Sequence, residues 1–314
     1  NFRQIIAAWR DDPIGDISGF NYHAIMAHAH ANDIKVMLQG HGVDELCWGY
    51  PWVRDTVAAN ERLPGGSFER IRSAGSMRAK IAAALDAFKS GHAAVEGFQM
   101  FERQPYTAWV MNHGQELFSP EFRDASRWDE LTAAREYGES GLRTDLEVTR
   151  LIVEFYLRGN GIAQGDRLSM LNSVEARLPF VDHKFVETVI GLRKAERDDH
   201  LPLKYWIKES VRDLLGDEII DRPKRGFAPP GARWQQALRD HFGEMLRDGF
   251  LVGTGILTRS IADKFAQPEL PDACEAIVSR LAITLEFWAR GVVLDETFSS
   301  PDASGTYMTS GGAN

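Results

Sequence analysis

The stretch KVMLQGHGVDELCWGYPW, residues 35–52, decides the fold. Its first four residues form a β-compatible run, apolar after Lys35, and a glycine-rich break follows directly. A helical pattern precedes the run over 22–31, and an acidic residue favours a new helix start at Asp44. The order helix, strand, glycine turn, helix is typical of an α/β protein.

The turn after the predicted strand contains Gln39, Gly40 and Gly42, and Asp44 and Glu45 follow at once. In open α/β sheets, ligands bind beyond the carboxyl ends of strands, where glycines let the backbone approach an anion closely. One interpretation is a phosphate cradle with a carboxylate directed at magnesium. The other is an ordinary turn before a helix whose first turn favours acidic residues. The spacing alone favours the ordinary turn, because short glycine patterns are common.

Composition bounds the class of protein. The chain has 314 residues, 44% of them hydrophobic, and a net charge of −9. It can therefore bury a sizeable core, and it lacks the basic excess of a nucleic-acid-coating or polybasic membrane-binding protein. Cys47 and Cys274 match no metal-ligand spacing and are expected to be reduced thiols. No apolar run is long enough to span a bilayer, so we expect no membrane or nucleic-acid partner and a cytoplasmic location.

The remaining pattern is largely helical. We expect an α/β remainder at 1–54, a helical segment at 55–150 and a second helical part at 151–292 that contains two further motifs. The last part, 293–314, is small and polar and predicts a disordered tail. We find no internal repeat, so 1–292 is expected to act as one domain.

A second motif is GDRLSMLNSVEARLPFVDH, residues 165–183. Asp166, Arg167, Glu175 and Arg177 lie among residues that favour burial, and buried charges must be paired or used. A structural ion-pair network and a functional site both satisfy this requirement.

A third motif is DRPKRGFAPP, residues 221–230. Proline before Lys224 and glycine after Arg225 would fix a short loop whose cationic groups face one place, as phosphate-binding loops require. Exposed loops are often basic for solubility alone, so this motif by itself is weak.

Four segments, in this order, resemble the synthetase domain of the asparagine synthetase family, and the resemblance spans residues 9–292. The segments are DDPIGDIS at 11–18, LQGHGVDELCWGYPW at 38–52, GDRLSMLNSVEARLPFVDHKFVE at 165–187 and LKYWIKESVRDLLGDEIIDRPKRGFAPP at 203–230. Their agreement is more specific than any one motif, and it favours the functional interpretations of Asp44 and Lys224.

The resemblance implies the adenine-nucleotide α-hydrolase-like fold, also called the PP-loop ATP pyrophosphatase fold. Its parallel sheet would be truncated at its start and joined to a large helical region. It also implies ATP and Mg²⁺ as cofactors and a small-molecule carboxylate as substrate, with aspartate expected. The carboxylate is adenylated with release of pyrophosphate, and ammonia derived from glutamine then attacks the adenylate to give an amide.

The family's site residues carry over position by position. His41 and Lys224 are expected to be catalytic, and Asp44 is expected to bind the metal. The ATP-binding residues would be Gln39, Gly40 and Gly42. The substrate wall would contain Asp166 and Arg167, with Glu45, Glu175 and Arg177 in supporting roles.

Two parts of the family's sequence that should lie before residue 1 are not in this chain. The family's Ser-Gly-Gly-Leu-Asp-Ser pyrophosphate loop and its amino-terminal glutaminase domain are absent from these 314 residues. We therefore expect the chain to be a carboxyl-terminal fragment that is inactive alone. A homodimer is compatible with the resemblance.

A second departure lies at His41, where asparagine synthetases have glutamate, and at Gln39, where serine is usual. A histidine at this position can act as a general base near neutral pH. Three functions stay open: an asparagine synthetase-like amidotransferase, a specialised amide former of the β-lactam synthetase or lasso-peptide cyclase type, and a degenerate, non-catalytic binding domain.

Overall fold

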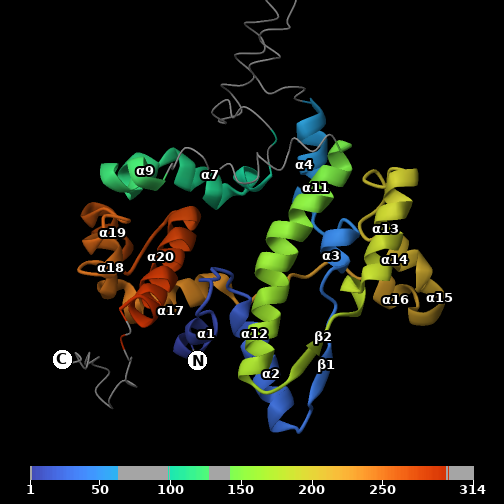
Figure 1. The fold of residues 1–314 in the computed structure, drawn as a ribbon, viewed down its shortest axis with the longest axis horizontal. Coiled ribbons are helices and arrows are strands. Elements are labelled where there is room, and N and C mark those ends of the chain that lie inside the picture. Colours follow the sequence, from blue (N-terminus) through green and yellow to red (C-terminus); the bar gives the residue numbers. More distant parts are fainter. Residues whose placement is uncertain (1, 63–97, 99, 127–141, 295, 297–314) are drawn as a thin grey trace, which may run out of the picture.

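The computed structural model describes residues 2–62, 98, 100–126, 142–294 and 296 (Figure 1). Its amino-terminal part is a helix pair followed by a strand and two further helices. These elements are α1 (Phe2–Ala8), α2 (Gly19–Ala31), β1 (Val36–Leu38), α3 (Val43–Leu46) and α4 (Pro51–Arg62).

The strand predicted after α2 is present and has a parallel partner. β1 pairs with β2 (Glu175–Arg177), with Val36 opposite Glu175 and Leu38 opposite Arg177. We expected a helical part at 151–292, and β2 is a short strand within it. β2 escapes a pattern search because it is three residues long, has a charged residue at each end and alternates exposed, half-buried, exposed. In the described residues the sheet has these two strands alone.

The helix predicted to start at Asp44 is a single turn. α3 begins after Gly42, whose φ of 96° requires glycine, and Trp48 ends the turn region with a φ of 56°. The glycine has a second reason: a Cβ here would lie 2.7 Å from Val181 Cγ1.

The described part of the segment 55–150 is mostly helical. It contains η1 (Phe101–Arg103), α7 (Pro105–Asn112), α8 (Gly114–Leu117), α9 (Pro120–Ser126) and α11 (Thr144–Leu151), besides the end of α4. The tail predicted at 293–314 lies outside the described residues except for 293, 294 and 296.

A long central helix runs through the molecule (Figure 1). α11 continues into η2 (Ile152–Ile162), a π-helix of 11 residues, and then into α12 (Ala163–Leu171). π-helical segments are rare and are frequently found at functional sites. This one contributes Tyr156 to two neighbouring clefts.

The carboxyl-terminal elements pack on both sides of this central helix (Figure 1). On the β2 side lie η3 (Pro179–Val181), α13 (His183–Ala195), α14 (Tyr205–Ser210), α15 (Arg212–Leu215) and α16 (Asp217–Ile220). On the α1 side lie α17 (Gly231–Phe242), η4 (Gly243–Leu246), α18 (Phe250–Gly253), α19 (Arg259–Phe265) and α20 (Ala273–Val292).

The main hydrophobic core joins distant parts of the chain. Phe2 of α1 stacks on Phe20 at 5.9 Å and on Phe242 at 5.5 Å, and it meets Phe287 of α20 edge-on at 5.2 Å. Burying each such ring stabilises the fold by about 1.5–3 kcal/mol. The first twenty residues are thus fixed to the carboxyl-terminal helices. In the part of the chain described, we find no helix with the length and apolarity needed to cross a membrane.

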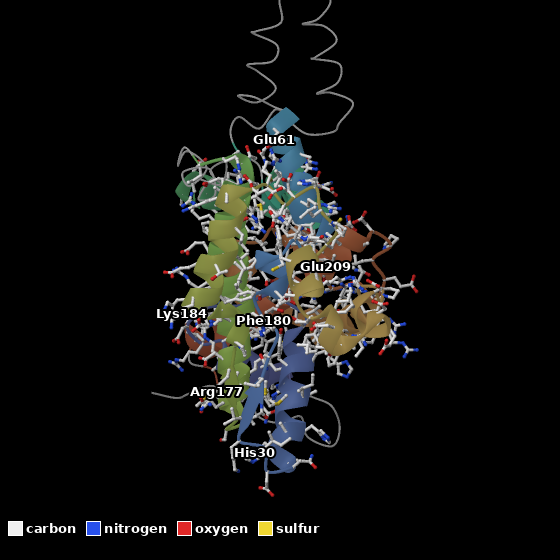
Figure 2. The ribbon with its side chains drawn as sticks, turned by 90° about the vertical axis from the view of Figure 1, so that its right-hand side faces the viewer. His30, Glu61, Arg177, Phe180, Lys184 and Glu209 are labelled. Carbon is white, nitrogen blue, oxygen red and sulfur yellow. The ribbon has the colours of Figure 1, made fainter. Side chains whose placement is uncertain are left out.

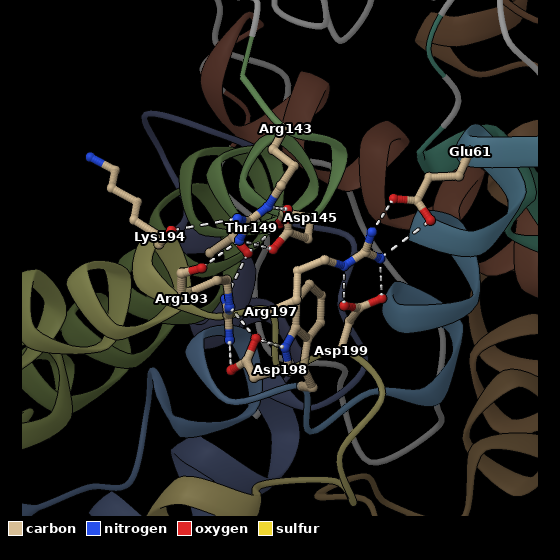
Figure 3. A network of polar contacts seen from close by, with 10 residues as sticks. Glu61, Arg143, Asp145, Thr149, Arg193, Lys194, Arg197, Asp198 and Asp199 are labelled. Carbon is tan, nitrogen blue, oxygen red and sulfur yellow. Dashed lines mark hydrogen bonds and ion pairs between the residues drawn. The ribbon is translucent and has the colours of Figure 1, made fainter.

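A buried polar network connects α13 to α3 (Figure 3). Arg193, fully buried, donates from Nε and Nη2 to the carboxylate of Asp198 at 2.7 and 3.0 Å. Its Nη2 also donates to the carbonyl of Leu46, the last residue of α3, at 2.6 Å. Asp198 accepts further hydrogen bonds from the indoles of Trp48 and Trp206. The buried guanidinium of Arg193, which is paired with Asp198, therefore fixes the end of α3, the helix that contains Asp44.

Candidate functional site

A cleft of about 530 Å³ opens at the carboxyl end of β1. Its walls come from the start of α2, from residues 39–50, from Tyr156 of η2 and from residues 224–228. Of the residues selected from the sequence, the structure brings six together in this wall: Gln39, Gly40, His41, Asp44, Glu45 and Lys224. Gly42, two residues from Gly40, starts the α3 turn beside them.

Asp44 is held between two lysines. Its Oδ1 accepts from Lys224 Nζ at 2.5 Å and lies 2.7 Å from Lys204 Nζ. Burial alone would raise the pKa of Asp44, but the hydrogen bonds and charges of the two lysines outweigh burial and lower it. The carboxylate therefore stays ionised in a half-buried place.

Glu45 has a structural position beside this pair. Its Oε2 accepts from the backbone N–H of Gly42 at 3.2 Å, and its Oε1 accepts from the Tyr50 hydroxyl at 2.9 Å. Burial raises the pKa of Glu45, an effect that these hydrogen bonds only partly oppose. The residue fixes the turn at Gly42 and orients Tyr50 toward the cleft.

His41 forms a pair with Tyr22 of α2. Its Nε2 lies 2.8 Å from the Tyr22 hydroxyl, and the two rings are stacked with centroids 5.3 Å apart. Burial lowers the pKa of His41 and raises that of Tyr22. The imidazole is thus neutral and the phenol protonated at neutral pH, so the imidazole is the member of the pair that can accept a proton.

Two features of the strand end suit a bound ligand. Gln39 Oε1 is buried and has no hydrogen-bond partner among the described residues. Buried acceptors are normally satisfied, so this one calls for a donor such as an amino or hydroxyl group of a ligand. A Cβ added at Gly40 would meet no atom within 4 Å, which leaves the backbone accessible here.

The loop between α16 and α17 closes the cleft. Lys224 Nζ lies 4.9 Å above the centre of the Tyr50 ring, and the ring of Phe227 lies 4.7 Å from that of Tyr22. The loop therefore places a cation and an aromatic ring over the strand end, and a cation–π contact helps to hold Lys224.

Asp166 and Arg167 do not line this cleft. Asp166 lies on α12 and lines a smaller pocket of about 280 Å³, together with Gln39 and His41. Arg167 lines neither, and its Nη1 is buried without a hydrogen-bond partner in the described structure. Their role as a substrate wall stays a prediction.

Glu175 and Arg177 lie on β2, outside the cleft. Arg177 Nε donates to Glu175 Oε1 at 2.9 Å, and the side chains are 60% and 55% exposed for Arg177 and Glu175. Figure 2 shows Arg177 on the outer side of the molecule, below Phe180. An exposed pair of this kind contributes little to stability. Their supporting role also stays a prediction.

Sequence reasoning missed Tyr22, Asp16 and Tyr156, which line the cleft, and Lys204, which contacts Asp44 beside it. Lys204 has a φ of 61°, and its N–H donates to the carbonyl of Cys47 at 2.8 Å, which places its side chain on Asp44. Such a tertiary contact leaves no local signal. Asp16 lies inside the segment 11–18, which resembles the family. Its position there was the one sequence feature that could have identified it as a site residue.

Cys47 is not a nucleophile here. It is buried, and burial raises the pKa of its thiol to about 11. A thiol with this pKa remains protonated at neutral pH, as expected for a small buried residue.

Asp44 is the side chain best suited to a magnesium ion. Mg²⁺ is usually bound by one or two carboxylates, with phosphate oxygens and water completing the shell. Within the described residues no group of three or more His, Cys, Asp or Glu side chains could hold a metal. A single carboxylate is compatible with an ion that arrives with a phosphate ligand, and Asp44 as its protein ligand stays a prediction.

Comparisons with known proteins identify the family of the sequence. The sequence model of the family described as Asparagine synthase matches residues 1–290. A comparison with solved structures gives no significant match.

Curated relatives are distant and longer. The chain is 26% identical to "Amidase chyE" of Penicillium rubens, over 73% of this chain and 37% of the relative. It is 20% identical to "Asparagine synthetase [glutamine-hydrolyzing] 1" of Bacillus subtilis, over 76% of this chain and 37% of the relative. It is 23% identical to "Amidase chry2" of Gibberella zeae, over 93% of this chain and 46% of the relative. The chain thus spans less than half the length of these relatives.

Proposed function

The chain belongs to the asparagine synthase family, and from this premise we propose that its full-length form catalyses ATP-dependent amide formation. A carboxylate oxygen attacks the α-phosphorus of ATP, the α–β phosphoanhydride bond breaks and pyrophosphate leaves. Ammonia then attacks the acyl carbon, the bond to AMP breaks, and the amide forms with loss of a proton from nitrogen.

The observation that carries the proposal is Asp44 between Lys204 and Lys224, beside the glycine turn after β1. Charge builds on phosphate oxygens during adenylation, so cations fixed near them lower the barrier. Both ammonium groups form ion pairs with the same carboxylate, and a triphosphate would offer them another anionic partner. Lys224 and Lys204 would then stabilise the departing pyrophosphate.

Asp44 would also hold Mg²⁺ that accompanies ATP, and when bound the ion would neutralise phosphate charge. Gln39 would accept a hydrogen bond from the nucleotide through its unpaired Oε1. Gly40 and Gly42 would let the backbone approach the phosphates, as expected from the sequence.

His41 and Tyr22 would handle the proton. The neutral imidazole lies 2.8 Å from the Tyr22 hydroxyl and can accept a proton from the attacking amine. By family likeness the nitrogen would be ammonia from glutamine, released by a glutaminase domain elsewhere in the full-length protein.

A second candidate function is a specialised amide former that acts on a carboxylate other than aspartate. The pair of His41 and Tyr22 favours it, because the resemblance predicts glutamate at position 41. Two relatives that bear the name amidase also support it. A degenerate binding domain would need no ionised Asp44 between lysines, so this third possibility has less support.

Pyrophosphate release tests the function. The full-length protein is incubated with ATP, Mg²⁺, glutamine or ammonium and a panel of carboxylic acids that includes aspartate. We expect release with at least one acid and a loss of about 10²-fold or more in Asp44→Asn. Asp33→Asn is the matched control, because Asp33 is 99% exposed. No release with any acid would refute the proposal.

A further inference from the structure

A second cleft of about 630 Å³ adjoins the first. Asp16 and Tyr156 line both clefts, so the two spaces meet at these residues. Residues 12–17 of the segment DDPIGDIS also line it, but no role was expected for them from the sequence, and the volume exceeds what a small amino acid needs.

One wall of the second cleft is aromatic. It is formed by Trp52, Phe101, Tyr106, Phe155 and Tyr156. Two of these residues come from the π-helix η2, which turns them toward the cleft. Such a wall suits a flat apolar body, since ring contacts add to the free energy gained by burial.

Arg280 of α20 also lines this cleft. This side chain is 8% exposed, and its Nη1 donates to the carbonyl of Gly15 at 2.5 Å. Its Nε is buried and has no hydrogen-bond partner among the described residues. Among the described residues Arg280 forms no ion pair within 4.0 Å; the carboxylate that acts on its charge is that of Asp16, at longer range.

Asp16, the acid nearest the junction, is already engaged. Its Oδ1 accepts from the N–H of Ser18 at 2.8 Å, and its Oδ2 accepts from Asn160 Nδ2 at 2.7 Å. The charge of Arg280 is therefore buried without a direct counter-ion, which is costly unless a ligand supplies one. A carboxylate is the natural partner, because the guanidinium fork matches its two oxygens.

We propose that this cleft binds the acceptor acid, and that the acid combines an aromatic body with a second carboxylate that pairs with Arg280. The inference rests on the proposed function, since it names the substrate class of the same reaction. The aromatic body would lie on the wall that contains Trp52 and Tyr156. The carboxyl group to be activated would extend past Asp16 toward Lys224.

Binding without ATP tests the inference separately from catalysis. Isothermal titration calorimetry of the full-length protein compares phenylsuccinate with succinate, which lacks the ring, and with 3-phenylpropionate, which lacks the second carboxylate. We expect phenylsuccinate to bind at least tenfold more tightly than either comparator.

Three variants locate the binding. Arg280→Lys and Arg280→Met should weaken phenylsuccinate binding about tenfold or more and change 3-phenylpropionate binding less than twofold. Gln104→Trp should weaken both ring-containing acids, because it fills the cleft and leaves Arg280 intact. Arg239→Lys is the matched control: Arg239 is also buried and has unpaired nitrogens, but it lines neither cleft. If the Arg280 variants do not fold, the binding of phenylsuccinate to Gln104→Trp tests the inference.

The outcomes separate the two proposals. Equal binding of phenylsuccinate and succinate, or binding unchanged in Arg280→Lys and Gln104→Trp, overturns the inference even if aspartate supports pyrophosphate release. Arg280-dependent binding of phenylsuccinate supports the site. If no acid that binds there, and no other acid, supports pyrophosphate release, the proposed function fails while the binding site stands.

Discussion

Lys224 Nζ lies 2.5 Å from Asp44 Oδ1, although 180 residues separate the two in the chain. Lys204 reaches the same oxygen at 2.7 Å. One carboxylate thus joins the turn after β1, the start of α14 and the loop before α17. A bound anion could therefore compete with Asp44 for the two ammonium groups.

Lys224→Met should reduce pyrophosphate release by the full-length protein about 10²- to 10³-fold, because it removes a cation that would face the departing charge. The rate of pyrophosphate release under steady-state conditions measures the effect. Lys184→Met is the control, since Lys184 lies exposed on α13 (Figure 2). Equal activity in the two variants would show that Lys224 has no role in the reaction.

Lys204→Met should raise the pKa of Asp44. The carboxyl pKa is lowered by two lysines against the opposing effect of burial, so removing one lysine leaves burial less opposed. Asp44 would then take up a proton at a higher pH, and the acidic limb of the pH–rate profile would move upward. A carboxyl NMR titration reads the pKa directly. A shift of the same size in the exposed Lys194→Met would contradict this cause.

The sequence predicted the strand at β1 and the cleft residues that follow it, because both lie within one short motif. It could not predict β2, whose charged residues at positions 175 and 177 do not have the pattern of a buried strand. The placement of Lys204 depends on a hydrogen bond to Cys47, and that of Tyr22 depends on the packing of α2. Motif spacing thus identified most acids and glycines of the site, whereas the contacts between distant segments required the fold.

His41 should make stability depend on pH. Burial lowers its pKa below the ordinary value of 6.5, so below that pH the unfolded chain binds a proton that the folded chain excludes. This contribution to the free energy of unfolding is present above about pH 6.5 and is lost as pH falls through the folded pKa. Urea unfolding at several pH values should show a shallower acid loss in His41→Gln than in the unsubstituted protein.

The control for this measurement is His30→Gln, because His30 is exposed at the far end of α2 (Figure 2). Burial also lowers the pKa of His23, but that residue is present in both proteins and cancels in the comparison. An identical acid slope in His41→Gln and the unsubstituted protein would exclude a buried neutral imidazole at position 41.

Gly49→Ala should displace Asp44. A Cβ at position 49 would overlap Asp44 Oδ1 and lie 2.6 Å from Asp44 Cα, so the carboxylate or the turn must move. We expect at least a tenfold loss of pyrophosphate release, since small displacements of positioned groups are costly. Gly191→Ala on α13 is the control, because its Cβ would meet no atom within 4 Å. It should retain activity and stabilise the helix by about 0.5–1 kcal/mol.

Arg193→Met should destabilise the protein by about 3–5 kcal/mol, because it leaves Asp198 as an unpaired buried carboxylate. Hydrogen bonds and charge from Arg193 now hold the pKa of Asp198 down against burial. Arg197→Met, which breaks an exposed pair with Glu61 and a half-buried pair with Asp199 (Figure 3), should cost less, about 1 kcal/mol. Urea unfolding measures both. Since Arg193 also binds the carbonyl of Leu46, the first variant should lower activity as well. Full activity in a folded Arg193→Met protein would show that α3 needs no support from this network.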